Sequence, residues 1–396
     1  MAVGQGYSKT ATNGLVFAFD TGDTRNSFLG RPTTNLMEGY GLSNYNNVPG
    51  SVTTTLSQTS DSYRGTPIWI QTLTPLDGSG VSWLSNGNNP GLGVVSSGGG
   101  GLANRYTGHS IFYKSTVPMH SVPIFLAYSN IGGWQCNTCP PEDMGDGWFR
   151  AKVLWYDTTT RSDGKYWAIN PLSATLNTPI TIYWAGPFKE DLNSQYISQY
   201  TPTSRSNTQS LLALAGNTTL SVADVSFNSN LQTAFDGTND YIQTALTGTY
   251  SQITYEFMGF FDDPTLNVFS RDESAFGDWT SSRIHFGTRW SVGMHWNVNG
   301  VWNQIPTTNL RYGWNHYCLV WDNVNNQKLV YINGILSDSN TTNGNITMGD
   351  FKIGVATNLN YYYKGNIDVF KVYTRAITAG EVKQNYGHYK TRFNLP

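Results

Sequence analysis

"GNIDVFKVYTRAITAGEV", residues 365–382, holds the strongest structural signal in this sequence. Its first half is rich in Val, Ile, Phe and Tyr, which favour β-strands. Its second half predicts a helix, because Thr378 can cap the first turn and Glu381 stands three residues later, which is the capping-box spacing. The stretch therefore predicts a strand followed closely by one short C-terminal helix.

Similar strand-like runs recur along the rest of the chain, and most are bounded by Gly, Asn, Asp or Pro. They include "GLVFAFD", "PIFLAYS", "WFRAKVLWYD", "ITIYWAG", "ITYEFMGFF", "RIHFGT", "HYCLVWD" and "KLVYING". This spacing is typical of β-sandwiches and not of βαβ units. Asn333-Gly334 suits the two-residue turn of a hairpin. With 41 Gly and only 13% charged residues, the composition also predicts an all-β protein.

Length, charge and hydropathy exclude several classes of function. The 396 residues predict two domains. A net charge of −2 provides no basic surface for nucleic acid. No apolar run reaches the roughly 18 residues needed to cross a bilayer, so we expect no membrane insertion. The first residues lack the features of a signal peptide, so we expect synthesis in a cytoplasm without the secretory route.

The three cysteines do not form a zinc-binding pattern. Cys136 and Cys139 form a single "CNTC", and Cys318 stands alone in "HYCLVWD". A zinc site needs about four ligands, and no second CxxC or nearby HxxxH supplies the others. We expect Cys318 to be a buried, small apolar residue of a strand.

The segment from residue 231 onward resembles a concanavalin A-like jelly roll of the laminin-G/pentraxin type. The motifs are "AFDGTNDYI", "WNHYCLVWD", "VYINGIL" and, most specifically, "GNIDVFKVYTRAITAGEV". The resemblance covers about the last 170 residues, and it implies an antiparallel β-sandwich of two sheets. The opening run "GLVFAFD" is similar to the first strand of the same fold.

A second resemblance covers most of the preceding sequence. "GDGWFRAKVLW", "YWAGPFKEDLNSQYISQYTPTSRS" and "LLALAGNTTL" are similar to virion proteins of tailed bacteriophages. In such proteins a carbohydrate-binding-module-like jelly roll is often inserted in or placed before a laminin-G-like one. The implied organisation is an N-terminal segment, 1–37, that gives a first strand to the C-terminal domain, an inserted jelly roll at 38–205, and the laminin-G-like domain at 206–396.

"FDGTNDYI", residues 235–242, has a structural and a metal-binding interpretation. The resemblance implies a strand–turn–strand with Phe235, Tyr241 and Ile242 facing the core, and Asx side chains can bond their own turn backbone. The alternative is a calcium ion at Asp236 and Asp240, because several relatives carry calcium in rim loops. Calcium needs 6–8 oxygen ligands, which this stretch alone does not supply.

A hydrolase is the less favoured function. Glucan hydrolases also use this fold, and a retaining glycosidase needs two carboxylates about 5–5.5 Å apart. The chain has six glutamates, and none lies in a pattern that aims two acids from one strand. Glu256 is the one in a convincing strand, and Thr254 and Met258 beside it are not acids. No G-x-S-x-G or HExxH occurs. We therefore predict that the protein is not an enzyme.

Tryptophans and amides point instead to binding of glycans. Aromatic faces can stack on the apolar side of a sugar, while polar side chains bond its hydroxyls. The predicted contacts are Trp279, Arg289, Trp290, Trp296 and Asn297, with Trp134 from a separate loop. The alternative is that these rings fill cores or subunit interfaces. The even spacing of Trp290 and Trp296 predicts that both lie on one face of one strand.

Together these features predict a non-enzymatic virion surface protein, as a capsid decoration, head-fibre or tail-fibre component that adheres to glycans. The expected partners are other virion proteins, host cell-surface glycans and further copies of the chain. A cellular or secreted lectin or adhesin is the first alternative, and a glycan depolymerase is the second. No cofactor is expected, calcium being the exception left open.

Overall fold

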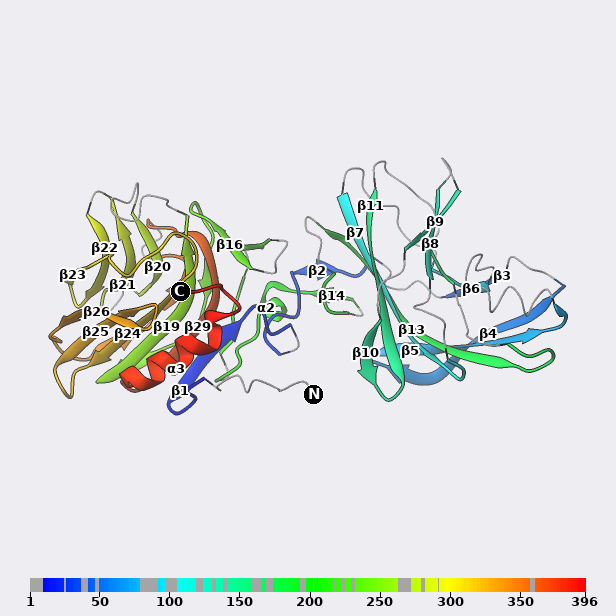
Figure 1. Cartoon of the computed structure of the whole chain (residues 1–396), viewed down its shortest axis with the longest axis horizontal. Helices are drawn as coiled ribbons and strands as arrows, with labels where there is room; N and C mark the ends of the chain where they lie inside the picture. Colours follow the sequence, from blue (N-terminus) through cyan, green and yellow to red (C-terminus); the bar gives the residue numbers. More distant parts are fainter. Residues whose placement is uncertain are drawn as a thin grey trace. The chain divides into compact units, whose positions relative to one another are not determined.

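The computed structural model describes residues 10–24, 26–36, 42–46, 50–78, 92–96, 105–118, 124–129, 133–137, 141–157, 165–168, 174–192, 197–201, 203–216, 218–222, 225–228, 232–262, 272–278, 282–290, 292–356 and 360–396. The chain divides into two compact units (Figure 1). Unit 1 comprises Met1–Pro32 and Ser206–Pro396, and unit 2 comprises Thr33–Arg205.

The first sheet of unit 1 is centred on β29 (Lys364–Tyr373), which pairs with β1, β16 and β19. Every pairing in this sheet is antiparallel. The other strands are β1 (Leu15–Asp20), β15 (Ser226–Phe227), β16 (Thr233–Asp236), β19 (Gln252–Phe261), β24 (Asn315–Asp322), β25 (Gln327–Ile332) and β26 (Ile335–Asn340). Residues from both ends of the chain therefore share one hydrogen-bonded sheet.

The second sheet of unit 1 packs against the first through aromatic rings. Its strands, in spatial order, are β17 (Ile242–Gln243), β28 (Lys352–Ile353), β20 (Glu273–Asp278), β21 (Ile284–Arg289), β22 (Gly293–Val298) and β23 (Val301–Ile305). Phe257 of β19 lies with its ring centroid 6.0 Å from that of Phe276 and 5.5 Å from that of Phe286. A separate pair, β18 (Gly248–Tyr250) and β27 (Ile346–Met348), completes the described strands of this unit.

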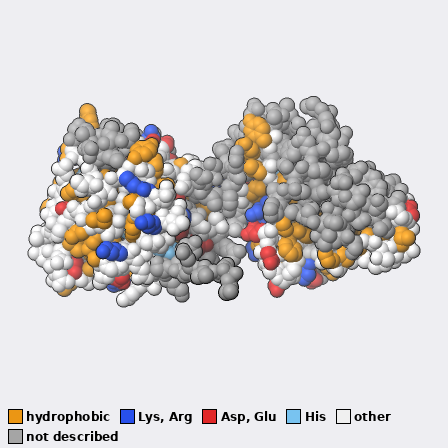
Figure 2. Space-filling model, viewed as in Figure 1, with side chains coloured by type: hydrophobic (Ala, Val, Ile, Leu, Met, Phe, Trp, Pro, Cys, Tyr) orange, Lys and Arg blue, Asp and Glu red, His pale blue; other side chains and the backbone are white. Residues whose placement is uncertain are grey.

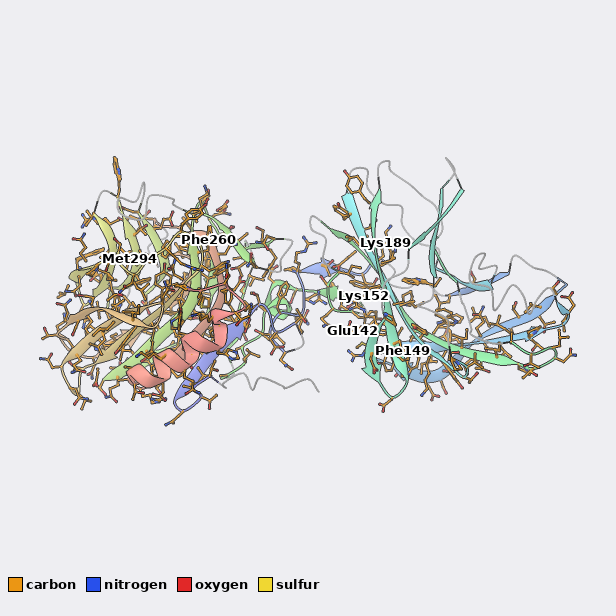
Figure 3. All side chains as sticks on the ribbon, in the orientation of Figure 1. Glu142, Phe149, Lys152, Lys189, Phe260 and Met294 are labelled. Carbon is orange, nitrogen blue, oxygen red and sulfur yellow. The ribbon has the colours of Figure 1, made fainter. Side chains whose placement is uncertain are left out.

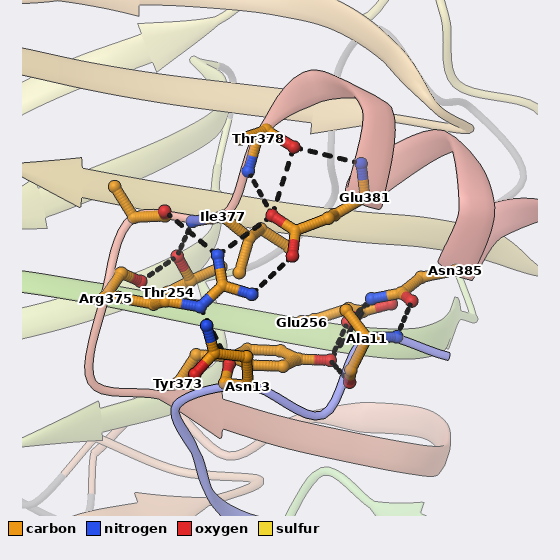
Figure 4. Close-up of polar contacts among 11 residues, drawn as sticks. Ala11, Asn13, Thr254, Glu256, Tyr373, Arg375, Ile377, Thr378, Glu381 and Asn385 are labelled. Atoms are coloured by element: carbon orange, nitrogen blue, oxygen red, sulfur yellow. Dashed lines mark hydrogen bonds and ion pairs between the residues drawn. The ribbon is translucent and has the colours of Figure 1, made fainter. Parts of the chain in front are cut away.

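Helix α3 (Ala379–Lys390) covers the outer face of the first sheet (Figure 1). The predicted capping box is confirmed, because Thr378 Oγ1 accepts from the Glu381 backbone N–H and Glu381 Oε2 accepts from the Thr378 N–H. Arg375 donates to the Asn13 carbonyl and to Glu381, so it ties the N-terminal segment to the helix (Figure 4). The described residues also contain α2 (Asn207–Ser210), a four-residue helix that the sequence did not predict.

A buried polar cluster lies beneath α3, and Glu256 of β19 is its centre (Figure 4). Glu256 Oε1 lies 2.9 Å from His316 Nε2, while Glu256 Oε2 accepts from Tyr373 Oη at 2.9 Å and from Asn385 Nδ2 at 2.7 Å. Burial would raise the pKa of Glu256, but Lys371, 3.9 Å away, and the bond to His316 outweigh it and lower this pKa to about 2. The carboxylate is therefore ionised and bonded from three elements.

Among its described residues, unit 2 has two larger antiparallel sheets besides the two-stranded pair of β2 (Thr33–Thr34) and β14 (Ser204–Arg205). The first contains, in spatial order, β10 (Glu142–Gly145), β11 (Trp148–Asp157), β7 (Arg105–Ser115), β13 (Ile180–Leu192), β5 (Thr66–Pro75) and β4 (Val52–Tyr63). The second contains β3 (Ser43–Asn46), β6 (Leu92–Ser96), β12 (Lys165–Ala168), β8 (Ile124–Ser129) and β9 (Gly133–Asn137). Trp167 of β12 joins Ile111 and Trp184 in one buried cluster. Glu142 and Lys152 pair at 3.2 Å at the partly exposed edge (Figure 3).

The all-β fold class is confirmed, as are several local predictions. Asn333 and Gly334 both have positive φ, 51° and 75°, and form the two-residue turn between β25 and β26. Cys318 is fully buried. Gly365 has a φ of 144°, and a Cβ there would lie 1.8 Å from the Phe260 carbonyl oxygen, so this position requires glycine. On the face of unit 1 seen in Figure 2, the side chains of Lys, Arg, Asp and Glu are scattered among hydrophobic and other side chains.

Replacing residues 33–205 with a short glycine linker should leave unit 1 folded. Thr33 and Arg205 are cross-strand partners in β2 (Thr33–Thr34) and β14 (Ser204–Arg205), so the cut ends lie only about 5 Å apart. Residues 206–396 alone should not unfold cooperatively, because β29 would lose β1 and the core would lose Phe17 and Phe19. Thermal unfolding followed by circular dichroism compares the two chains. Equal melting temperatures would contradict a structural role for β1.

Glu256→Gln should lower the free energy of unfolding by roughly 3 kcal/mol at pH 7, because it leaves Lys371 without its counter-charge. The folded pKa of Glu256 lies below its ordinary value of 4.5, so its contribution is present above pH 4.5 and is lost as pH falls toward 2. The difference between wild type and variant should therefore shrink between pH 5 and pH 3. Urea unfolding at several pH values measures it.

Asp262→Asn is the matched control, because Asp262 pairs with Lys364 at 3.1 Å with both side chains nearly half exposed. This change should cost less than about 1 kcal/mol at every pH. A Glu256→Gln penalty that does not vary with pH would show that the variant disturbs packing and not charge.

Candidate functional site

Strand alternation places a row of polar and aromatic side chains on the outer face of the second sheet. Phe286 of β21 and Trp296 of β22 are fully buried on the core side. Their neighbours His285 and Asn297 are cross-strand partners, and Asn297 in turn pairs with Trp302 of β23. Because alternate residues point to opposite faces, these three side chains lie on the face that points away from the core.

Two histidines form the base of this face. His285 Nδ1 and His295 Nε2 lie 3.0 Å apart, so one ring donates a hydrogen bond to the other. The rings are stacked, with centroids 4.8 Å apart and planes 21° apart. Both side chains are nearly inaccessible to solvent. The mutual hydrogen bond fixes the orientation of both imidazoles.

Both imidazoles are neutral at neutral pH. Burial, and then the neighbouring His295, holds the pKa of His285 well below its usual range. Burial likewise lowers the pKa of His295 to about 4; the Gly293 carbonyl opposes this shift, while the Arg289 charge adds to it. A neutral imidazole carries one N–H donor and one acceptor nitrogen. The pair is therefore an uncharged, hydrogen-bonded base beneath the pocket.

Trp302 forms an aromatic wall beside the histidines. Its ring centroid lies 4.6 Å from that of His295 and 5.6 Å from that of His285. The side chain is 44% exposed, so part of its ring faces solvent. The Arg289 guanidinium carbon lies 5.6 Å from the centroid of the Trp302 ring, which is a cation–π distance. An apolar surface and a positive charge are thus held side by side.

These groups line an open pocket of about 190 Å³. Its lining residues are Asp272, His285, Thr288, Arg289, His295, Trp302 and Tyr361. Pockets that enclose a drug-sized ligand measure roughly 300–1,000 Å³, so this one suits a single ring or the end of a longer chain. At its rim, Asp272 Oδ1 accepts from the Trp290 backbone N–H at 2.6 Å, which fixes the turn after β21.

Asn297 adds hydrogen-bonding capacity behind the pocket. Its side chain is fully buried, and neither the amide oxygen nor the amide nitrogen bonds to any described residue. Buried amides without a partner are uncommon and costly in folded proteins. Between His285 and Trp302 in the cross-strand row, Asn297 is therefore a donor and acceptor that a bound polar group or water can satisfy.

The structure places the predicted glycan contacts in different environments. Arg289 lines the pocket and Asn297 lies beside it. Trp290 is 68% exposed in the turn after β21, and Trp296 is fully buried in β22. The prediction that Trp290 and Trp296 share one strand face is wrong, because a turn separates them. Trp279 and the side chain of Trp134, a residue of β9, lie outside the described residues.

Asp236 and Asp240 organise their own turn. Asp236 Oδ1 accepts from the Thr238 and Asn239 N–H groups, and Asp240 Oδ2 accepts from the Asp236 N–H at 2.8 Å. Phe235 and Ile242 face the core as predicted, whereas Tyr241 is half-buried, since adjacent strand residues point to opposite sides. Within the described ranges, no three His, Cys, Asp or Glu side chains converge as metal ligands.

Sequence reasoning missed His285, His295, Asp272 and Tyr361 as members of one site. The histidines are ten residues apart, and only the register of the β21–β22 hairpin brings them together. A signal was present: His285 and His295 each precede an apolar residue, Phe286 and Trp296, within strand-like runs. Reading both runs as one hairpin would have predicted two histidines on its outer face.

The two facing sheets of unit 1 agree with a family comparison. Residues 236–383 match the model described as the concanavalin A-like lectin/glucanases superfamily. This part of the chain has the concanavalin A-like lectin/glucanase fold. The pocket lies within this concanavalin A-like part. No curated protein matches the chain in sequence.

Solved structures give weaker likenesses. The botulinum neurotoxin serotype D binding domain is 15% identical with a TM-score of 0.39, covering 48% of this chain and 53% of that one. The serotype D ligand binding domain in complex with N-acetylneuraminic acid is 14% identical, with a TM-score of 0.38 and the same coverage. The chain thus spans about half the length of these toxin domains.

Another likeness is to domain 4 of a GH43 extracellular arabinanase from Geobacillus stearothermophilus, in complex with arabinotriose. It is 19% identical with a TM-score of 0.32, covering 44% of this chain and 84% of that one. At these identities and TM-scores the likeness to solved structures does not extend to function.

Neither of the described helices has the length and apolar character needed to cross a membrane.

Proposed function

We propose that the protein binds glycans, without cleaving them, at the pocket around Trp302, His285 and His295. The observation that carries this proposal is the partly exposed Trp302 ring held beside a neutral pair of hydrogen-bonding imidazoles. A sugar ring has an apolar C–H face that can stack on the indole, and hydroxyls that can exchange hydrogen bonds with polar groups of the pocket lining such as Arg289 and Asp272.

The carboxylates of unit 1 support binding over hydrolysis. Glycoside hydrolysis ordinarily needs two carboxyl groups across the scissile bond. Of the described pocket residues, only Asp272 carries one, and it accepts a hydrogen bond from the Trp290 backbone. Glu256, the acid in the most convincing strand, is buried under α3 on the other sheet. Among the described pocket residues, Asp272 therefore has no second carboxyl group of the kind that glycoside cleavage ordinarily needs.

We also propose that the protein lies on the surface of a tailed-bacteriophage particle, as a capsid decoration, head-fibre or tail-fibre component. The support is the similarity of "GDGWFRAKVLW" and its neighbouring stretches to such virion proteins, with residues 38–205 as a carbohydrate-binding-module-like insertion. Many copies on a particle, or a homo-oligomer, would raise the effective concentration of a weak site. A cellular or secreted lectin or adhesin of the same fold is the alternative function.

Trp302→Ala should abolish glycan binding, because it removes the stacking surface, while the melting temperature stays close to that of the wild type. Trp296→Ala is expected to cost roughly 3–5 kcal/mol of stability instead, since that ring is in the core. Trp290→Ala removes an exposed ring that does not line the pocket and should retain binding. A glycan array probed with a multivalent form of the protein measures binding.

A reducing-end assay on every retained glycan accompanies the array. New reducing ends produced by the wild type would contradict the non-enzymatic function. Binding lost in Trp290→Ala but kept in Trp302→Ala would move the site to the turn after β21. A wild type that retains no glycan in multivalent form would leave only a structural role.

If the protein lies on the surface of a virion, it should co-purify with intact particles of the phage that encodes it. Mass spectrometry of density-purified particles should detect it, and gold-labelled antibodies should place it on the head or the tail by electron microscopy. Absence from purified particles would favour the cellular lectin or adhesin.

A further inference from the structure

Arg289 is a positive charge in the pocket without an ionic partner among the described residues. Its guanidinium makes a cation–π contact with Trp302, and no carboxylate among the described residues lies within ion-pair distance of it. Other cationic side chains of unit 1 do have such partners: Arg375 pairs with Glu381, Arg392 with Asp20, and Lys364 with Asp262. Arg289 therefore keeps its charge and its donors available to a ligand.

Other charged side chains lie near Arg289 in the structure. Asp272, the carboxylate of the pocket, is engaged by the Trp290 N–H and does not pair with Arg289. Lys328 adds a second cation on the core side of β22, where its Nζ donates to the Trp296 carbonyl at 2.9 Å and to Asn303 Oδ1 at 2.5 Å. Arg289 and Lys328 both lower the pKa of His295, while Asp272 raises it. Two cations and Asp272 therefore act on His295, while the Asp338 carboxylate acts on Lys328.

We propose that this pocket selects sugars that carry a carboxylate, with the sugar ring on Trp302 and the carboxylate on Arg289. The inference rests on the proposed glycan-binding function and specifies its ligand class. A guanidinium presents two parallel N–H donors that match the two oxygens of a planar carboxylate. The stacking contact of Arg289 with Trp302 positions this fork beside the surface on which the sugar ring would lie. Uronic and sialic acids share this chemistry.

The test compares an oligosaccharide that contains glucuronic acid with the same oligosaccharide after reduction of its carboxyl groups. Calorimetry at 150 mM NaCl should show that the wild type binds the acidic form at least about tenfold more tightly, as expected for a charge-assisted bidentate contact. Arg289→Gln should remove this preference, so that the acidic form binds no more tightly than the reduced form does to the same variant. Arg289→Lys should recover only part of the preference, because lysine supplies a charge without the fork.

Lys383→Gln is the control, because it changes the net charge by the same amount at an exposed position of α3, far along the chain from the pocket strands. It should leave both affinities as in the wild type. Equal binding of the acidic and reduced forms, or a preference that persists in Arg289→Gln, would overturn the inference. Equally tight binding of a sulfated analogue would show that charge is read without the carboxylate shape, which also overturns it.

Failure of the proposed function looks different in the same experiment. If the wild type binds neither sugar form, and Trp302→Ala changes nothing on a glycan array, the pocket is not a glycan site. If Trp302→Ala abolishes binding while Arg289→Gln does not alter it, the glycan site stands and only the selectivity for carboxylates is refuted.

Discussion

The buried carboxylate of Glu256 is the constraint on which unit 1 depends. An ionised group without solvent is tolerated only when charge and hydrogen bonds compensate its lost hydration. Here the compensation comes from Tyr373 on β29, Asn385 on α3 and the neighbouring Lys371 and His316. These residues are far apart in the sequence, so the carboxylate is satisfied only when β19, β24, β29 and α3 are all in place.

The same cluster extends to the N-terminal segment. The Ala11 backbone N–H donates to Asn385 Oδ1 at 2.7 Å, and the Tyr373 hydroxyl lies 3.2 Å from the Ala11 carbonyl oxygen. Arg375 adds its bond to the Asn13 carbonyl. Residues 374 positions apart in the sequence are therefore hydrogen-bonded at one buried site. These bonds act together with the pairing of β1 and β29 to hold the N-terminal segment on the first sheet.

The position of the pocket also depends on Glu256, because alternate side chains along each strand point to opposite faces of its sheet. Glu256 faces α3, so its neighbours Tyr255 and Phe257 face the opposite side and form the aromatic layer. Phe286 packs on that layer, which turns His285 outward to meet His295. Burial of both imidazoles then keeps them neutral beside the exposed part of Trp302. The features that favour sugar hydroxyls are thus consequences of how the two sheets pack.

The sequence by itself determined the local structure. Strand-forming residues, the capping box of Thr378 and Glu381, the turn at Asn333-Gly334 and the Asx turn at Asp236 depend on neighbours within a few residues, and the structure confirms each of them. The all-β class follows from the same local preferences. The sequence also indicated a tryptophan- and amide-rich region, and Arg289 and Asn297 from that region do lie at the pocket.

Only the tertiary structure decided which of those side chains meet. Whether Trp290 and Trp296 share a face depends on where the turn between β21 and β22 falls, and that position is set by hydrogen bonds between strands. Trp296 is buried because the first sheet covers it, and Trp302 stays open because β23 is at the edge of the second sheet. Pairing of His285 with His295 likewise requires the strand register. Register and burial are non-local properties, because they arise from contacts between strands and not from the residues of one strand.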